Sequence, residues 1–212
     1  ADTGGAAARG DWQLAPAAAT RRLAALYGAA PAGADPCALA PGDSLRCERG
    51  RADTWEELLA PGRPLLLELA DARRFAARAL FLGIEDGAAM LAGPDGVLTV
   101  PLSTLAERWT GGYWYYWQLP LAWDGTVSRG DRGASVAVVA ELFARLDGQA
   151  RPLSRERFTA PLEERVRLFQ RGASLADDGV VGERTLQALV LAAGADLDRA
   201  AARRLLDGDG QT

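Results

Sequence analysis

The side chains that could carry chemistry in this chain are two cysteines and many carboxylates, because its 212 residues include no histidine. Histidine is the usual general base near neutral pH and the commonest metal ligand. Its absence excludes a Ser-His-Asp triad, a Cys-His pair and any histidine-containing zinc site. Cys37 and Cys47 alone cannot supply the four ligands of a structural zinc. We therefore expect no metal and no cofactor.

Carboxylates are the remaining candidates for catalysis. The adjacent pairs are Glu56 with Glu57, and Glu163 with Glu164. Neighbouring positions on a helix point in different directions, so neither pair is placed to share a substrate. Such residues more often form a solvated face. We expect no catalytic residue in the chain, with a carboxylate-based wall hydrolase as the alternative.

Cys37 and Cys47 could be two buried thiols or a disulfide. The residues between them include Pro41, Gly42 and Asp43, which favour a turn that brings the two sulfurs together. The disulfide is the preferred interpretation, and it indicates an oxidising compartment such as a periplasm. No run of about 18 apolar residues is present. If the disulfide is present, either an export signal or membrane anchor has been removed or the sequence is an excised part of a longer protein, and the excised part is the preferred interpretation.

The stretch "FQRGASLADDGVVGERTLQALV", residues 169–190, joins two apolar-periodic segments through a tight Asp-Gly turn. It is either an ordinary link between helices or the signature of a binding module. Nucleic acid is not the expected ligand, since the net charge is −4 and no long basic run is present.

The first half of the chain predicts an α+β domain. The spacing of Leu23, Leu26 and Tyr27 predicts a helix that ends at Gly28, and residues 30–50 read as an irregular connection. Thr54 is expected to cap a short helix, and Ser103 another. Four short apolar runs separated by turn residues predict an antiparallel meander: residues 63–70, 77–85, 88–93 and 96–102.

The aromatic run "YWYYWQLP" predicts a further strand. Alternation should place Tyr113, Tyr115 and Trp117 on one face and Trp114 and Tyr116 on the other. Packing against the first helix is the preferred interpretation, and an exposed sugar-stacking platform is the alternative.

The second half predicts three amphipathic helices, within residues 129–148, 159–170 and 182–193. Short amphipathic helices must pack together to bury their apolar stripes. A boundary near residues 122–129 divides the chain into a first domain, 1–125, and a three-helix domain, 126–212.

This second half resembles the peptidoglycan-binding module attached to many cell-wall hydrolases. The pattern of that family is matched at Gly130, Gly133 and Val136, and then at Val166, Phe169, Gln170, Leu175, Asp178, Gly179, Gly182, Thr185 and Leu189. Gly179 permits a positive φ in the turn, and Gly182 precedes the third helix. The first backbone N–H groups of that helix are free to bind the carboxylates and carbonyls of a wall peptide. Asp178, Gly179, Gly182 and Thr185 are expected mainly to build the turn. Gln170 and Arg184 are the preferred contacts with the wall.

The first half resembles the papain-like C39 peptidase domain of bacteriocin-processing transporters, without its chemistry. The frame is present as Leu26-Tyr27-Gly28, the apolar strands and "RWTGGYWYYW". The position of the family's cysteine falls near residues 15–17, that of its histidine at Ala77 or Arg78, and its Asp-Pro becomes Gly93-Pro94. A nucleophile without its base is not activated. The resemblance implies a degenerate, non-catalytic domain.

A degenerate peptidase frame followed by a peptidoglycan-binding module resembles the periplasmic part of the general secretion pathway A family, the inner-membrane ATPases of type II secretion. The resemblance implies an ATPase domain and a membrane anchor upstream, a general secretion pathway B partner, and a role in secretin assembly. This stretch has no nucleotide-binding loop. A pure interaction scaffold with a vestigial wall module is a further alternative.

Overall fold

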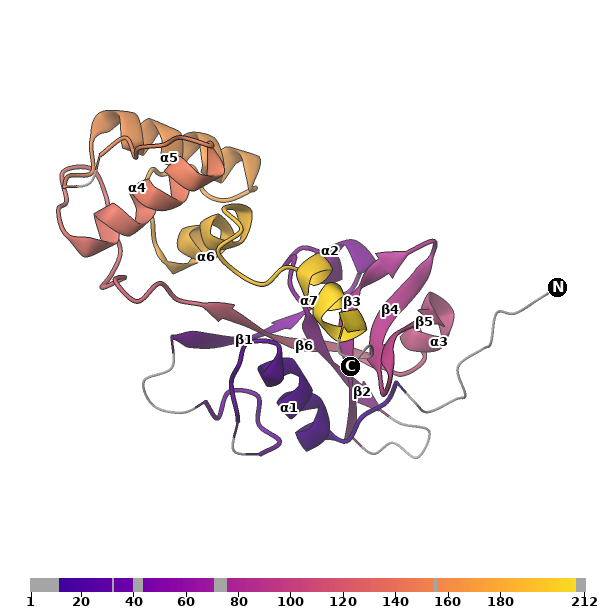
Figure 1. Ribbon diagram of the computed structural model, residues 1–212. Coiled ribbons are helices and arrows are strands. Elements are labelled where there is room, and N and C mark those ends of the chain that lie inside the picture. Colours follow the sequence, from indigo (N-terminus) through magenta and orange to yellow (C-terminus); the bar gives the residue numbers. More distant parts are fainter. Residues whose placement is uncertain (1–11, 32, 40–43, 71–75, 155, 209–212) are drawn as a thin grey trace. The chain divides into compact units, whose positions relative to one another are not determined.

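The computed structural model describes residues 12–31, 33–39, 44–70, 76–154 and 156–208 (Figure 1). The chain divides into two compact units. The first comprises residues 1–116 together with 197–212, and the second comprises residues 117–196.

The first unit is built on a six-stranded sheet in the order β1-β6-β2-β3-β4-β5. The elements are α1 (Pro16–Ala25), β1 (Leu45–Arg51), α2 (Trp55–Leu59), β2 (Leu65–Ala70), β3 (Ala76–Glu85), β4 (Ala88–Gly93), β5 (Gly96–Pro101), α3 (Leu102–Ala106), β6 (Trp109–Gln118) and α7 (Arg199–Gly208). Strands β2 to β5 form the predicted antiparallel meander. At the β3–β4 turn, Asp86 and Gly87 both have positive φ, 50° and 75°, as the tight hairpin turn requires.

Both faces of this sheet are covered. Successive leucines of β2 point to opposite sides, so that Leu65, Leu67 and Leu69 pack with Leu58 of α2 and Leu105 of α3. On the other face, the core contains Leu66, Leu80, Leu82, Tyr116, α1 residues Ala19 and Leu23, and α7 residues Ala202 and Leu206. The sheet is therefore the middle layer of three.

The aromatic strand β6 is a packing element. Tyr113 and Tyr115 belong to the α2/α3 face, and Trp114 and Tyr116 to the α1/α7 face, which confirms the predicted alternation for these four residues. Trp117 is also fully buried. Trp114 and Tyr115 are partly buried, so the arrangement supports packing, the preferred interpretation.

The structure confirms one local prediction in the first unit and differs from two others. Thr54 caps α2, accepting the Glu57 N–H at 3.2 Å while the Glu57 carboxylate accepts the Thr54 N–H. Ser103 is not a cap, because α3 begins one residue earlier, after Pro101. The connection predicted over residues 30–50 contains strand β1.

The end of the chain departs from the predicted division at residues 125 and 126. That division assigned all of residues 126–212 to the helical domain, whereas the structure groups residues 197–212 with the sheet. Helix α7 contacts β3 and β5. The reason is its apolar stripe, since Ala202 and Leu206 are one turn apart and complete the core on the α1 side.

Cys37 and Cys47 form the predicted disulfide, with Cα atoms 5.2 Å apart. Cys47 lies in β1, and Cys37 follows Pro36, whose carbonyl accepts the buried Tyr116 hydroxyl at 2.6 Å. The cross-link therefore joins an edge strand to a segment anchored on the core. Residues 40–43, the predicted turn between the cysteines, lie outside the described residues.

Burial raises the pKa of Tyr116 to about 12, with the Asp35 charge adding to the effect. The pKa in the unfolded chain is about 10. Because the folded value is the higher one, the contribution of the neutral phenol to stability is complete below about pH 10 and is lost as the pH rises through about 12.

The Tyr116→Phe variant should be less stable than the wild type by about 1 kcal/mol at neutral pH, since the Pro36 carbonyl loses its donor. Between about pH 10 and 12 the difference should shrink, because only the wild type then loses the contribution of a neutral phenol. Urea unfolding across this pH range measures both effects. A stability difference that stays constant with pH would contradict the assignment.

The second unit contains the three predicted helices, α4 (Ala134–Leu146), α5 (Ala160–Gly172) and α6 (Glu183–Ala192). Helix α4 packs on α6, and the rings of Phe143 in α4 and Phe169 in α5 meet edge-on at 5.7 Å. Val127 and Val181 pair as a short antiparallel bridge, which ties the entry segment to the α5–α6 turn. The fully buried apolar side chains are Val136, Val139, Phe143, Phe158, Leu162, Val166, Val181, Leu186 and Leu189.

Candidate functional site: the α5–α6 turn

Gln170 is the centre of the turn between α5 and α6. Its side chain is 1% exposed. The amide nitrogen lies 2.9 Å from the Asp178 carboxylate, 2.9 Å from the Val180 carbonyl and 3.2 Å from the Thr185 hydroxyl. The amide oxygen accepts the Gly179 N–H at 2.9 Å. One buried side chain thus holds four points of the turn.

This geometry engages Gln170 inside the turn. A side chain so deeply buried, with its donors and its acceptor used inside the turn, cannot reach a ligand without opening the turn. We therefore expect Gln170 to position the turn, and its contact with the wall stays a prediction. Thr185 is also buried and lies inside the same network.

Gly179 is fixed at its position by backbone conformation and by space. Its φ is +76°, and an added Cβ would lie 2.9 Å from Cγ of Glu163 and 3.0 Å from Nε of Arg167. Any other residue would carry both the strain of the left-handed region and this overlap. Glycine is therefore the residue that lets the turn close against α5 without strain.

Asp178 is exposed and orders the turn from outside. Its Oδ1 accepts the Val180 N–H and the Gln170 amide, each at 2.9 Å. These hydrogen bonds, the one from Val180 first, hold the pKa of Asp178 below its ordinary value. The side chain is therefore ionised at neutral pH.

The first turn of α6 is the accessible part of the site. Gly182 is the N-cap and supplies no side chain to cap the helix. Glu183 and Arg184 follow, and both are exposed. Of the six predicted site residues, Gln170, Asp178, Gly179 and Thr185 are joined in one network, Gly182 starts the helix, and Arg184 is exposed in the first turn of α6.

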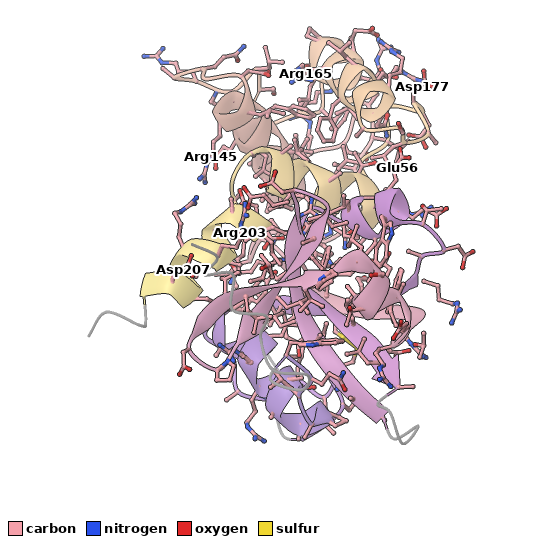
Figure 2. All side chains as sticks on the ribbon, turned by 90° about the vertical axis from the view of Figure 1, so that its right-hand side faces the viewer. Glu56, Arg145, Arg165, Asp177, Arg203 and Asp207 are labelled. Carbon is pink, nitrogen blue, oxygen red and sulfur yellow. A yellow bond between two sulfur atoms is a disulfide. The ribbon has the colours of Figure 1, made fainter. Side chains whose placement is uncertain are left out.

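Charged side chains of α5 border the turn, and sequence reasoning did not identify their role. Arg167 pairs with Glu163 at 3.2 Å and donates to the Asp177 carbonyl. Arg171 pairs with the Asp177 carboxylate at 3.4 Å, and Figure 2 labels Asp177 at this edge of the helical unit. The i,i+4 spacing of Glu163 and Arg167 was the available signal.

The structure brings together the two segments where the resembled peptidase would have its cysteine and histidine. Leu14 and Arg78 exchange backbone hydrogen bonds of 2.8 and 3.0 Å. The Arg78 guanidinium donates to the Thr20 hydroxyl at 2.6 Å, to the Pro16 carbonyl at 3.3 Å and to the Ala34 carbonyl. Arg78 therefore bridges the start of α1, β3 and the segment before the disulfide.

The described ranges contain no group of three or more cysteine, aspartate or glutamate side chains arranged to hold a metal ion. None of the helices described is both long enough and apolar enough to cross a membrane.

Three comparisons relate the chain to known proteins. Residues 132–189 match the family described as "Putative peptidoglycan binding domain". The chain is 30% identical over 160 residues to the general secretion pathway protein A of Aeromonas hydrophila, a match covering 74% of this chain and 28% of that protein. The chain thus corresponds to roughly a quarter of its relative's length.

A solved structure extends the relationship to nearly the whole chain. The periplasmic domain of the EpsAB fusion protein of the Vibrio vulnificus type II secretion system matches with a TM-score of 0.70 and 26% identity, over 95% of this chain and 87% of that one. Together with the hydrogen-bonded α5–α6 turn, these matches define the family. The chain belongs to the general secretion pathway A family of type II secretion, and residues 132–189 are its peptidoglycan-binding domain.

Proposed function

We propose that this chain is a non-catalytic periplasmic region that binds peptidoglycan through its helical unit and a protein partner through its sheet unit. In this role it supports assembly of the type II secretion secretin across the cell wall. The partner proposed is a general secretion pathway B-type protein, with secretin subunits as the further cargo. The membrane anchor belongs to a part of the protein outside this sequence.

The observation that carries the wall-binding part is the α5–α6 turn inside the matched domain. Gln170 fixes Gly179, Val180 and Thr185, so the first turn of α6 is held open with no side-chain cap. The backbone N–H groups of a helix's first turn favour anionic and carbonyl ligands. Arg184 adds a cationic side chain at the same place. Wall peptides supply the complementary carboxylates and carbonyls.

The proposed lack of catalysis is supported by the structural roles of the residues that were candidates for chemistry. Arg78, at one of the two positions predicted for the lost histidine, is engaged in three side-chain hydrogen bonds. Among the paired carboxylates, Glu57 caps α2 and Glu163 pairs with Arg167. These roles are structural.

Partner binding by the sheet unit is proposed from the relatives. The similar Vibrio vulnificus protein is an EpsAB fusion, which supports a close working association between A-type and B-type components. The helical unit carries the wall-binding match, so the sheet unit is the part left for a protein partner.

Retention on purified sacculi tests the wall-binding proposal. The wild-type chain should co-sediment with sacculi, and Arg184→Ala should reduce its affinity about tenfold or more, as expected for the loss of a charge-assisted hydrogen bond. Arg151→Ala is the matched control, because Arg151 is an exposed arginine of the same unit outside the turn. Both variants should melt with the wild type.

Two results would count against the proposal. Wild-type retention no greater than that of an unrelated protein would remove the wall-binding role. Clearing of a sacculus suspension by the purified chain would replace the non-catalytic role with a hydrolase.

A further inference from the structure

A cavity of about 360 Å³ lies on the sheet unit beside the N-terminal half of α7. Its volume is within the range of small-ligand pockets. The walls combine apolar side chains with two arginines of α7: Leu59, Leu82, Ile84, Arg199 and Arg203. Figure 2 labels Arg203 on this helix. The match to the peptidoglycan-binding domain ends at residue 189 and does not include the cavity.

Arg199 is the unusual member of this lining. Its Nη1 is buried and has no hydrogen-bond partner among the residues that the structure describes. Burial, followed by the nearby charge of Arg203, lowers the pKa of Arg199, and Asp198 opposes the shift. Asp198 already accepts the Ala201 N–H at 2.6 Å as part of the first turn of α7.

Arg203 does not supply a hydrogen-bond partner for Nη1 of Arg199. Its Nη1 lies 3.0 Å from the Glu85 carboxylate and 3.1 Å from the Met90 sulfur. The side chain is thereby held in place, one helical turn from Arg199. It adds a second guanidinium to the same wall, where Glu85 offsets its charge and where the Asp198 side chain also lies.

A guanidinium nitrogen buried without a partner costs free energy, and an anion from outside can remove that cost. The planar guanidinium is suited to a carboxylate, which it can bind through two parallel hydrogen bonds. The apolar walls formed by Leu59, Leu82 and Ile84 suit an aliphatic group next to that carboxylate. Both features fit a short peptide segment.

We infer that this cavity binds a carboxylate of a protein partner, either a chain end or an acidic side chain, with an aliphatic residue beside it. The inference rests on the proposed function, in which the sheet unit meets a protein. The partner contacts the sheet unit at the Arg199 side of α7.

Three acetylated peptides test this inference and distinguish the two sources of the carboxylate. They are Ala-Leu with a free carboxyl end, Ala-Leu amide, and Ala-Glu-Leu amide. In NMR titrations of the full chain, saturable shifts are expected at the amides of Gly62, Gly83 and Ala200. The free-end peptide identifies a chain end, the glutamate peptide identifies an acidic side chain, and Ala-Leu amide should produce no saturable shift.

The Arg199→Met variant should bind the active peptide at least about tenfold more weakly, yet melt at or above the wild-type temperature, because it removes a buried nitrogen that has no hydrogen-bond partner among the described residues. Arg204→Met is the matched control, since Arg204 is exposed on the same helix and outside the cavity lining; it should leave binding unchanged. A purely structural Arg199 would instead make the methionine variant less stable.

The wild-type titration decides the matter even if a variant fails to fold. No saturable shift with either carboxylate peptide, or equal shifts with Ala-Leu amide, would overturn the inference. Sacculus retention is measured separately on Arg199→Met and should remain at the wild-type level. Failure of wall binding and failure of the carboxylate pocket are therefore distinguishable, and a retention loss confined to Arg199→Met would assign the cavity to the wall instead.

Discussion

Replacing Gln170 with alanine is expected to lower the free energy of unfolding of the helical unit by about 3 kcal/mol. The substitution leaves the buried Gly179 N–H and the Thr185 hydroxyl without their side-chain partner, and each buried group left unsatisfied costs about 1–3 kcal/mol. The Asp178 carboxylate and the Val180 carbonyl lose the Gln170 amide as their hydrogen-bond donor. Retention on sacculi should fall along with stability.

Calorimetry and sacculus co-sedimentation of the same samples test this prediction. Gln149→Ala is the matched control, because Gln149 is an exposed glutamine of the same unit, and it should melt like the wild type and bind the wall normally. A Gln170→Ala variant that keeps the wild-type melting temperature yet loses wall binding would restore the direct-contact role that the sequence favoured.

A sequence pattern can identify a turn without showing which of its side chains are buried. The spacing of Gln170, Asp178, Gly179 and Thr185 identified a built turn, because glycine in an Asp-Gly step before a helix has a physical reason. It did not reveal that the glutamine points inward. Burial of a polar side chain depends on which backbone groups the fold brings within reach, and these come from residues up to 15 positions apart.

Most of the fold was predictable wherever hydrophobic periodicity was strong. The meander β2 to β5 has apolar runs bounded by turn residues, and α4 to α6 have apolar residues at helical spacing. The alternation along β6 followed from the period of a strand. In these segments local pattern and tertiary packing agree.

The two elements that the sequence did not reveal have weak local signals. Strand β1, with the sequence LRCERGR, contains only two apolar residues and becomes a strand through its place beside β6. Helix α7 contains three arginines and a narrow stripe of Ala202 and Leu206. Its position against the sheet, across an intervening 80-residue unit, is a long-range contact that no window of sequence reports.

Because α7 completes the core of the sheet unit, the helical unit is an insertion in the chain between two elements of that unit, β6 and α7.

Removing the disulfide is expected to destabilise the sheet unit by about 2–4 kcal/mol, because the cross-link restricts the unfolded chain. The bond joins β1, an edge strand, to the segment anchored by the Tyr116 hydroxyl on Pro36. Of the β1 side chains, Leu45 and Cys47 are the ones that reach the core on this face. Without the bond, β1 is held by its pairing with β6, by Leu45 in the core and by the ion pair between Arg49 and Glu68.

Melting of the Cys37→Ala, Cys47→Ala double variant measures this loss, after thiol titration of the unreduced, denatured wild type has shown both cysteines to be bonded. Wall binding should be unchanged, because the matched domain contains neither cysteine. Two free thiols in the wild type would argue against an oxidising compartment. A double variant that melts with the wild type yet no longer binds sacculi would contradict the proposed division of labour, since the cross-link would then serve the wall site rather than the sheet.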